Sequence, residues 1–166
     1  MAEILMLPRA WERGLALATP PQLDRHPAGL GSLPAEWVVF DDISLRSGRH
    51  LDHVVIGPNG VFTIGLDPAD TPATIGPDGL YRQGLRVALP VKQALFGARE
   101  LRIALGLATI AYPVLVTDIA ADRHQLDRLG VVPGDHIAEY IWSHPGFPLR
   151  RSQRIELQWG VRALKR

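Results

Sequence analysis

The sequence contains no cysteine among its 166 residues, which excludes disulfide bonds, thiolate chemistry and cysteine-ligated zinc sites. Its six histidines show no zinc-ligand spacing. No apolar run is long enough to span a bilayer, and the run at residues 4–7 is too short and too close to charge for a secretory signal. We therefore expect a cytoplasmic protein with no membrane contact.

Two catalytic loops are also absent. The chain has neither the Gly-x-x-x-x-Gly-Lys-Ser/Thr loop of P-loop nucleotide hydrolases nor the Gly-x-Ser-x-Gly turn of serine hydrolases. Lysine is scarce, since Lys92 and Lys165 are the only lysines among 18 basic residues. The formal net charge of +1 creates no global field that would indicate nucleic acid as a partner.

Basic charge is nevertheless concentrated near the end of the chain, where Arg150, Arg151 and Arg154 are opposed only by Glu156. These arginines are either a solvated helix face or a surface that contacts nucleic-acid phosphates. The sequence alone leaves both interpretations open.

The length and an apolar share of 46% predict one compact domain with a substantial core. Residues 1–36 are rich in proline, and we expect them to form an extension that packs on the core through Trp11, Leu15 and Leu17. Residues 37–166 then form the domain itself.

The coarse element pattern predicts an α/β fold with a single mixed sheet flanked by helices. Residues 37–45, 51–56 and 61–66 are rich in strand formers, and the Gly-Pro-Asn-Gly turn at residues 57–60 joins the last two, which predicts an antiparallel meander. A second turn at residues 76–79 predicts a small hairpin. Residues 112–117 predict a buried strand.

Three helices are expected. Pro90 is predicted to open the first, as proline does at a first helical position. Apolar residues then recur at helical spacing and predict its buried face: Val91, Ala94, Leu95, Ala98, Leu101 and Leu105. Asp135 is predicted to cap a helix through Ile141, and a last helix to span residues 152–164 with Leu157, Val161 and Leu164 on its apolar stripe.

The stretch LDHVVIGPNGVFTI, which begins at Leu51, resembles the core motif of the nuclease-related domain (NERD) family. That motif reads I-D-H-V-V-V-G-P-x-G-V-F-V-I and is followed by Glu-x-Lys and, further on, by a proline shortly before a helix that carries a glutamine. Pro90 and Gln93 match this last part, and the resemblance covers residues 37–117. It implies a restriction-endonuclease-like PD-(D/E)XK nuclease fold with a Mg²⁺ or Mn²⁺ site at one end of the sheet.

Phosphodiester hydrolysis on this fold needs carboxylate ligands for the metal and a nearby cation. Asp52 matches the family aspartate, but Gly65 stands in place of the glutamate and Asp67 in place of the lysine. Strand alternation predicts that Asp67 faces the same side as residue 65, toward Asp52. Asp67 therefore either replaces the lost metal ligand, or the site has decayed and Asp67 caps the loop before Pro68.

Other polar residues have weaker claims to a catalytic role. Gln93 is either a residue that orients a water or a phosphate, or a polar residue at the edge of a helix. Lys92 points about 100° away from Gln93 on a helix and is not expected to take part. The family's upstream acid has no good match, since Glu36 is the only acid in that region.

The neighbours of Asp52 could also contribute. His53 alternates to the opposite face of the strand and is expected to be structural. Asp41 and Asp42 could join Asp52 in a carboxylate cluster, which would be the core of an alternative metal site.

Three functions follow. The first is a catalytically degenerate nuclease fold retained for binding nucleic acid or a protein partner, with no cofactor. The second is an active Mg²⁺- or Mn²⁺-dependent nuclease that uses Asp52 and Asp67. The third is an interaction module without nucleic acid. Convergent carboxylates would favour the second, basic C-terminal residues on the same surface as Asp52 would favour nucleic-acid binding, and an exposed apolar patch would favour the third.

Overall fold

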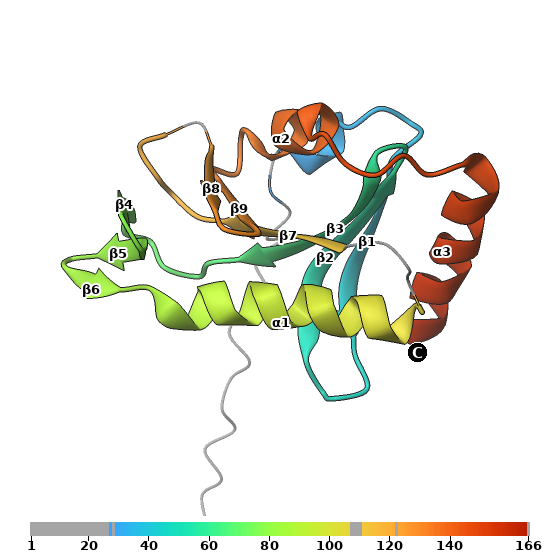
Figure 1. Ribbon diagram of the computed structural model, residues 1–166, viewed down its shortest axis with the longest axis horizontal. Coiled ribbons are helices and arrows are strands. Elements are labelled where there is room, and N and C mark those ends of the chain that lie inside the picture. Colours follow the sequence, from blue (N-terminus) through green and yellow to red (C-terminus); the bar gives the residue numbers. More distant parts are fainter. Residues whose placement is uncertain (1–26, 28, 107–110, 122, 166) are drawn as a thin grey trace, which may run out of the picture.

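The computed structural model describes residue 27 and residues 29–106, 111–121 and 123–165 (Figure 1). The predicted packing of Trp11, Leu15 and Leu17 lies outside the described residues. A six-stranded mixed sheet forms the centre of the domain, in the order β1-β2-β3-β7-β9-β8. Its strands are β1 (Val38–Ser44), β2 (His50–Gly57), β3 (Gly60–Leu66), β7 (Ala111–Val116), β8 (His124–Leu126) and β9 (Leu129–Val132).

The meander and the later buried strand are confirmed. β1 pairs antiparallel with β2 and β2 antiparallel with β3, while β7 pairs parallel with β3. Two short strands were not predicted: β9 pairs parallel with β7, and β8 pairs antiparallel with β9. The class is therefore α/β with a mixed sheet, as expected.

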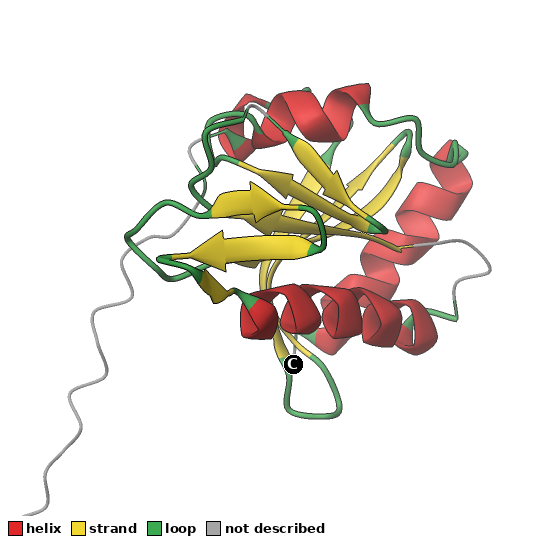
Figure 2. Cartoon of the chain, turned by 60° about the vertical axis from the view of Figure 1, so that its left-hand side comes forward, coloured by secondary structure: helices red, strands yellow, loops and turns green. Residues whose placement is uncertain are grey.

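The sheet is not single, which corrects the prediction. The expected hairpin is part of a separate three-stranded sheet, formed by β4 (Thr74–Gly76), β5 (Gly79–Arg82) and β6 (Leu85–Arg86). This small sheet lies beside the main one (Figure 2). A hydrogen bond of 2.7 Å from the Ala73 amide to the Asp118 carbonyl links the segment that leads into β4 to the loop after β7.

Helices cover both faces of the main sheet. α1 (Ala88–Ala104) and α3 (Arg151–Leu164) contribute Leu101 and Val161 to one core cluster, while α2 (Ile137–Ser143) and the short 3-10 helix η1 (Leu30–Ser32) contribute to a second cluster (Figure 1). None of the described helices combines the length and the apolar character needed to cross a bilayer.

The first helix begins earlier than predicted and uses a slightly different face. α1 starts at Ala88, so Pro90 is its third residue, still within the first turn, where the helix does not need a backbone donor. Ala94, Ala98 and Leu101 are buried as predicted, but Leu95 is 37% exposed. Gly97 is buried in its place against the Leu51 side chain.

Of the predictions for the two later helices, one is wrong and one is confirmed. α2 begins at Ile137 after His136, and no side-chain hydrogen bond caps it, so the predicted cap at Asp135 is wrong. α3 agrees with prediction to within one residue at its start, and Val161 is buried with Leu157 and Leu164 packed against the same cluster.

Trp37 covers the end of β2. A Cβ atom placed on Gly57 would lie 2.1 Å from the Trp37 Nε1 atom, so the indole and a side chain at residue 57 cannot share this space. Trp37 is only 9% exposed. The glycine is therefore required here by close packing.

We expect Gly57→Ala to lower the free energy of unfolding by about 1–3 kcal/mol, because the added methyl group displaces the Trp37 indole. Urea denaturation followed by tryptophan fluorescence measures the change. Gly31→Ala is the matched control, since a Cβ on Gly31 meets nothing within 4 Å. Equal stability of the two variants would show that the Trp37 contact is not tightly packed.

Candidate functional site

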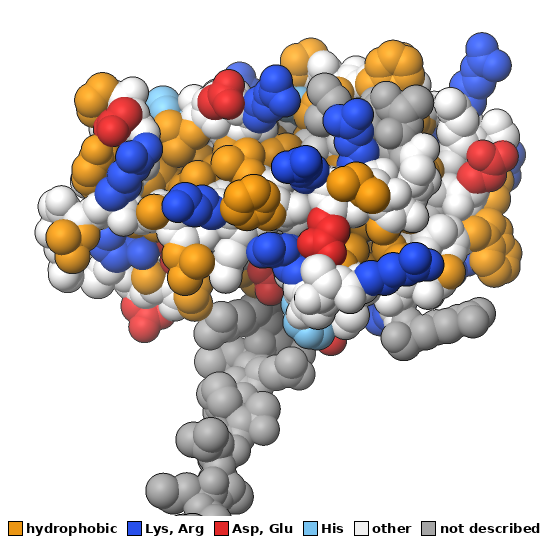
Figure 3. Space-filling model, turned by 60° about the horizontal axis from the view of Figure 1, so that its bottom comes forward, with side chains coloured by type: hydrophobic (Ala, Val, Ile, Leu, Met, Phe, Trp, Pro, Cys, Tyr) orange, Lys and Arg blue, Asp and Glu red, His pale blue; other side chains and the backbone are white. Residues whose placement is uncertain are grey.

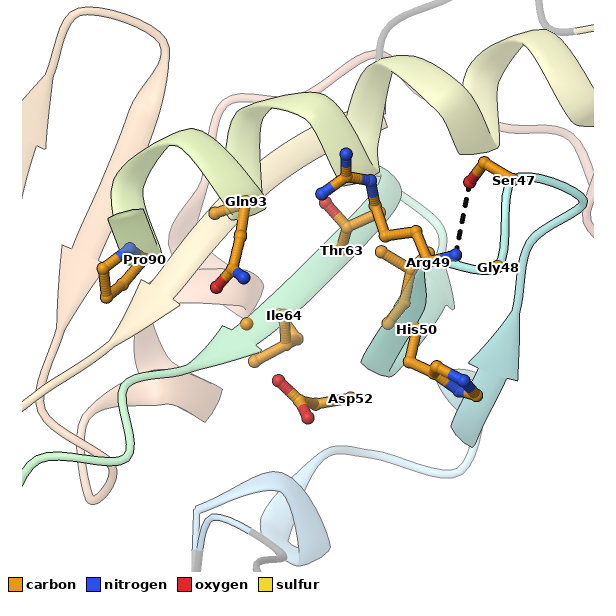
Figure 4. A pocket seen from close by; sticks show the side chains of 12 residues that line it. Ser47, Gly48, Arg49, His50, Asp52, Thr63, Ile64, Pro90 and Gln93 are labelled. Carbon is orange, nitrogen blue, oxygen red and sulfur yellow. Dashed lines mark hydrogen bonds between the residues drawn. The ribbon is translucent and has the colours of Figure 1, made fainter. Parts of the chain in front are cut away.

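A pocket of about 540 Å³ lies between the start of β2, the end of β3 and the first turns of α1 (Figure 4). We call it the Asp52 pocket. The β1–β2 turn and β2 supply Arg49, His50 and Asp52, β3 supplies Thr63, and α1 supplies Gln93. Sequence reasoning missed Arg49 and Thr63, because no motif marks either residue.

Asp52 and Gln93 both line this pocket. Figure 4 shows the Asp52 carboxylate and the Gln93 amide pointing into the same space from β2 and α1. Asp52 Oδ2 accepts a hydrogen bond of 2.8 Å from the Leu66 amide, which ties β2 to the end of β3. Lys92 does not line the pocket and is exposed, in agreement with its predicted direction.

Gly65 also lines the Asp52 pocket. A Cβ atom at this position would lie 3.7 Å from the Ala94 Cβ and 3.9 Å from the Val114 carbonyl oxygen, which are ordinary contacts. The position where the resemblance implies a glutamate therefore borders the pocket and has room for the start of a side chain. It provides no ligand atom as it stands.

Asp67 lies outside the Asp52 pocket and borders a different hollow, beside Thr117. Its side chain is 1% exposed and accepts hydrogen bonds from Arg82 Nη2 (2.5 Å) and Thr117 Oγ1 (2.9 Å). Strand alternation toward Asp52 does not extend to Asp67, because β3 ends at Leu66. Asp67 also accepts a 3.2 Å hydrogen bond from the Ala69 amide, so it caps the loop before Pro68 and does not replace a metal ligand of the Asp52 pocket.

Arg82 sets the charge state of Asp67. Burial alone would raise the pKa of this carboxyl group, but the hydrogen bonds from Arg82, Thr117 and the Ala69 amide, together with the positive charge of Arg82, lower the pKa below its usual range. Arg82 also donates a 2.8 Å hydrogen bond to the Thr71 carbonyl. Asp67 is therefore an ionised structural residue that connects β5 to the main sheet.

Asp41 and Asp42 have other partners. Asp41 Oδ1 lies 2.8 Å from Nδ1 of His53, whose side chain is buried on the strand face opposite to Asp52, as predicted. Asp42 adopts a left-handed conformation with φ of 52° and lies 3.4 Å from His50. Both aspartates are exposed. Within the described segments, no group of three or more His, Asp or Glu side chains could hold a metal ion.

The basic C-terminal residues lie at the other end of β2 from Asp52. The Leu149 amide donates to the Pro58 carbonyl in the β2–β3 turn, which places the adjacent Arg150 beyond the end of β2, whereas Asp52 is near its start. Arg154 extends further along α3 and contacts the Glu36 carbonyl. The structure therefore does not bring Arg150, Arg151 and Arg154 onto the surface of the Asp52 pocket.

Comparisons of the chain with family models, with curated proteins and with solved structures gave no match. What the Asp52 pocket can do must follow from its own residues. Its described polar side chains are the Asp52 carboxylate, the Gln93 amide, the Arg49 guanidinium, the His50 imidazole and the hydroxyls of Ser47 and Thr63. The buried Thr63 hydroxyl has no hydrogen-bond partner among the described residues.

Proposed function

We propose that this chain is a catalytically degenerate member of the nuclease-related domain family. Its restriction-endonuclease-like scaffold serves to bind nucleic acid or a protein partner and does not hydrolyse phosphodiester bonds. The order of its elements supports the ancestry: an antiparallel meander, then a helix, then a strand parallel to the third strand. The meeting of Asp52 with Gln93 in one pocket supports it further.

The observation that carries the loss of catalysis is the composition of the Asp52 pocket. Mg²⁺ and Mn²⁺ prefer several oxygen ligands, and carboxylates usually supply those that come from the protein. Only Asp52 supplies a carboxylate to the described lining, and one of its oxygens already accepts from the Leu66 amide. The residues present therefore do not fit a catalytic divalent cation.

The position that holds a lysine in the family motif also lacks a cation here. Asp67 stands where the family has its lysine, and its negative charge is neutralised by Arg82 outside the pocket. Among the described lining residues, Arg49 is the only lysine or arginine, and its guanidinium is bonded at 3.3 Å to Glu100. Stabilisation of charge on a transferred phosphate is thus lacking on this side of the pocket.

Calorimetric titration of Mn²⁺ into the wild type and Asp52→Ala tests the proposal. We expect no Asp52-dependent heat at about 1 mM Mn²⁺, because a single carboxylate holds a hard cation weakly. We also expect no cleavage of single- or double-stranded DNA above background. Metal binding and cleavage that both disappear in Asp52→Ala would establish the active nuclease instead.

Gly65→Glu is expected to restore Mn²⁺ binding with a dissociation constant of about 1 mM or lower, because it adds a second carboxylate to the pocket. The free space around Gly65 allows this substitution. Gly65→Gln is the matched neutral control, and Gly65→Glu combined with Asp52→Ala should lose the gain. If Gly65→Glu bound no better than Gly65→Gln, position 65 would not be the lost ligand position.

A further inference from the structure

The outward face of α1 carries a straight line of alternating apolar and basic side chains. Leu89, Lys92, Phe96, Arg99 and Ile103 follow one another at spacings of three and four residues, which places them on one face of the helix. We call this line the α1 stripe. All five residues are exposed, and Figure 3, which brings α1 forward, shows hydrophobic and basic side chains alternating along this face.

The apolar members of the α1 stripe are large and well exposed. Leu89 is 66% exposed, Phe96 51% and Ile103 70%. Single exposed apolar residues are common on protein surfaces, but these three recur every seven residues over about 21 Å of helix. The opposite face of α1 is buried through Ala98 and Leu101. A surface helix normally has a polar outer face, so three large apolar side chains on the outer face of α1 indicate a second packing surface.

The charge of the α1 stripe is positive, and no ion pair within the described part of the chain compensates it. Lys92 and Arg99 form no ion pair with any described residue, and neither does the neighbouring Arg102. Glu100 is the only acidic residue of α1, and Arg49 binds it at 3.3 Å. As far as the described residues go, the stripe therefore presents unpaired cations between apolar side chains, and the one acid of α1 is already bound by Arg49.

We propose that the α1 stripe docks an amphipathic helix of a partner protein, and that this helix carries acidic side chains within its apolar face. The three-and-four spacing of the stripe is the spacing at which two packed helices interlock. Apolar side chains of the partner would bury Leu89, Phe96 and Ile103. Asp or Glu at the intervening positions would pair with Lys92 and Arg99.

Charge complementarity distinguishes this occupant from the others. A second copy packed parallel to the first would place Lys92 and Arg99 against the same cations, which is unfavourable. An antiparallel copy would offer them only Glu100 from α1, and Arg49 already binds that acid. An amphipathic helix that lies on an anionic lipid surface keeps its cations on the polar face, away from the apolar one. In the α1 stripe the cations stand between the apolar residues, where an opposing row of carboxylates meets them.

A defined peptide probes this surface in the full-length chain. The probe is a helix-stabilised, fluorescein-labelled peptide of about 21 residues, with leucine at one core position of each heptad and glutamate at the other. A matched peptide carries lysine in place of glutamate. Fluorescence anisotropy is expected to give a dissociation constant of about 10–100 µM for the acidic peptide and at least about tenfold weaker binding of the basic one.

Variants connect the binding to the α1 stripe. Phe96→Ser is expected to weaken the acidic peptide about tenfold or more. Arg99→Glu is expected to weaken the acidic peptide and to strengthen the basic one, a reversal that misfolding does not produce. Ile155→Ser and Arg162→Glu, on the exposed face of α3, are matched controls that should leave both affinities unchanged, and circular dichroism verifies the fold of each variant.

Three results would overturn the proposal. The first is that the acidic peptide does not bind, or binds Phe96→Ser as well as wild type. The second is a dimer in sedimentation equilibrium that Phe96→Ser abolishes, which would assign the stripe to a second copy. The third is flotation with vesicles of 70% phosphatidylcholine and 30% phosphatidylglycerol that Arg99→Glu abolishes. None of these variants alters a residue of the Asp52 pocket. Failure of the peptide to bind would therefore not contradict the proposed nuclease ancestry, and metal binding in the Asp52 pocket would not contradict the docking proposal.

Discussion

Replacing Arg82 with methionine is expected to lower the free energy of unfolding at pH 7 by about 3–5 kcal/mol, because it leaves the Asp67 carboxylate buried without its cation. The Asp67 side chain is 1% exposed and that of Arg82 16%, so water cannot compensate for the loss. Thr117 and the Ala69 amide still donate to Asp67, but neither supplies a full positive charge. Urea denaturation monitored by circular dichroism measures the effect.

The pH dependence of this loss has a definite sign. In the wild type the folded-state pKa of Asp67 is lowered, so its contribution to stability is present above the unfolded value of about 3.9 and is lost as the pH falls through the folded pKa. In Arg82→Met, the hydrogen bond and the charge of Arg82 no longer lower the pKa of Asp67, so this pKa is expected to rise. The stability difference between the two proteins should therefore be smallest in acid and grow toward neutral pH.

Two further proteins make the Arg82 experiment specific. Arg86→Met is the matched control in the same small sheet, since the Arg86 side chain is 59% exposed and 3.9 Å from Asp78, and its loss should cost less than about 1 kcal/mol. Combining Arg82→Met with Asp67→Leu removes both charges and should recover much of the stability. A loss below about 1 kcal/mol in Arg82→Met would contradict a buried ion pair at this place.

Phe62→Ala is expected to destabilise the protein by about 3–5 kcal/mol, because it opens a cavity at the centre of the second core cluster. Phe62 is 0% exposed, and its ring centroid lies 5.3 Å from that of Tyr112 and 5.5 Å from that of His144. The same cluster holds Ile137 and Ile141, so α2 should lose order together with the sheet. Denaturation curves in urea give the change in stability.

Phe96→Ala is the appropriate comparison for Phe62→Ala, since it removes the same side chain from a position that is 51% exposed. We expect its effect to stay below about 1 kcal/mol. Similar losses in the two variants would mean that the Phe62 side of the sheet is loosely packed. Hydrogen exchange of the α2 amides would then show whether this helix is stabilised from elsewhere.

Local sequence signals were sufficient for most of the fold. Valine, isoleucine and phenylalanine runs separated by the Gly-Pro-Asn-Gly turn specify the meander with little help from distant residues. The β8–β9 hairpin was missed because its strands have only three and four residues and its turn uses Asp127, with φ of 52°, instead of an Asn-Gly pair. The start of the first helix was predicted at Pro90, but α1 begins at Ala88, because proline is tolerated throughout a first turn.

The candidate site was predictable only in part. Asp52 and Gln93 line one pocket, and each lies within a regular element whose side-chain directions follow from its period. Asp67 lies one residue beyond the end of β3, where strand alternation no longer applies. Its partner Arg82 belongs to a different sheet, and no spacing in the sequence indicates that the two residues meet.

The left-handed conformation of Asp42 also bears on solubility. β1 is an edge strand of the main sheet, and a long, regular edge strand invites the strands of other molecules to extend the sheet into an aggregate. A left-handed residue in the middle of β1, flanked by the exposed carboxylate of Asp41, interrupts the straight row of backbone donors and acceptors that such an addition requires. The two aspartates that form no metal site thus help to keep neighbouring copies of the domain from joining edge to edge.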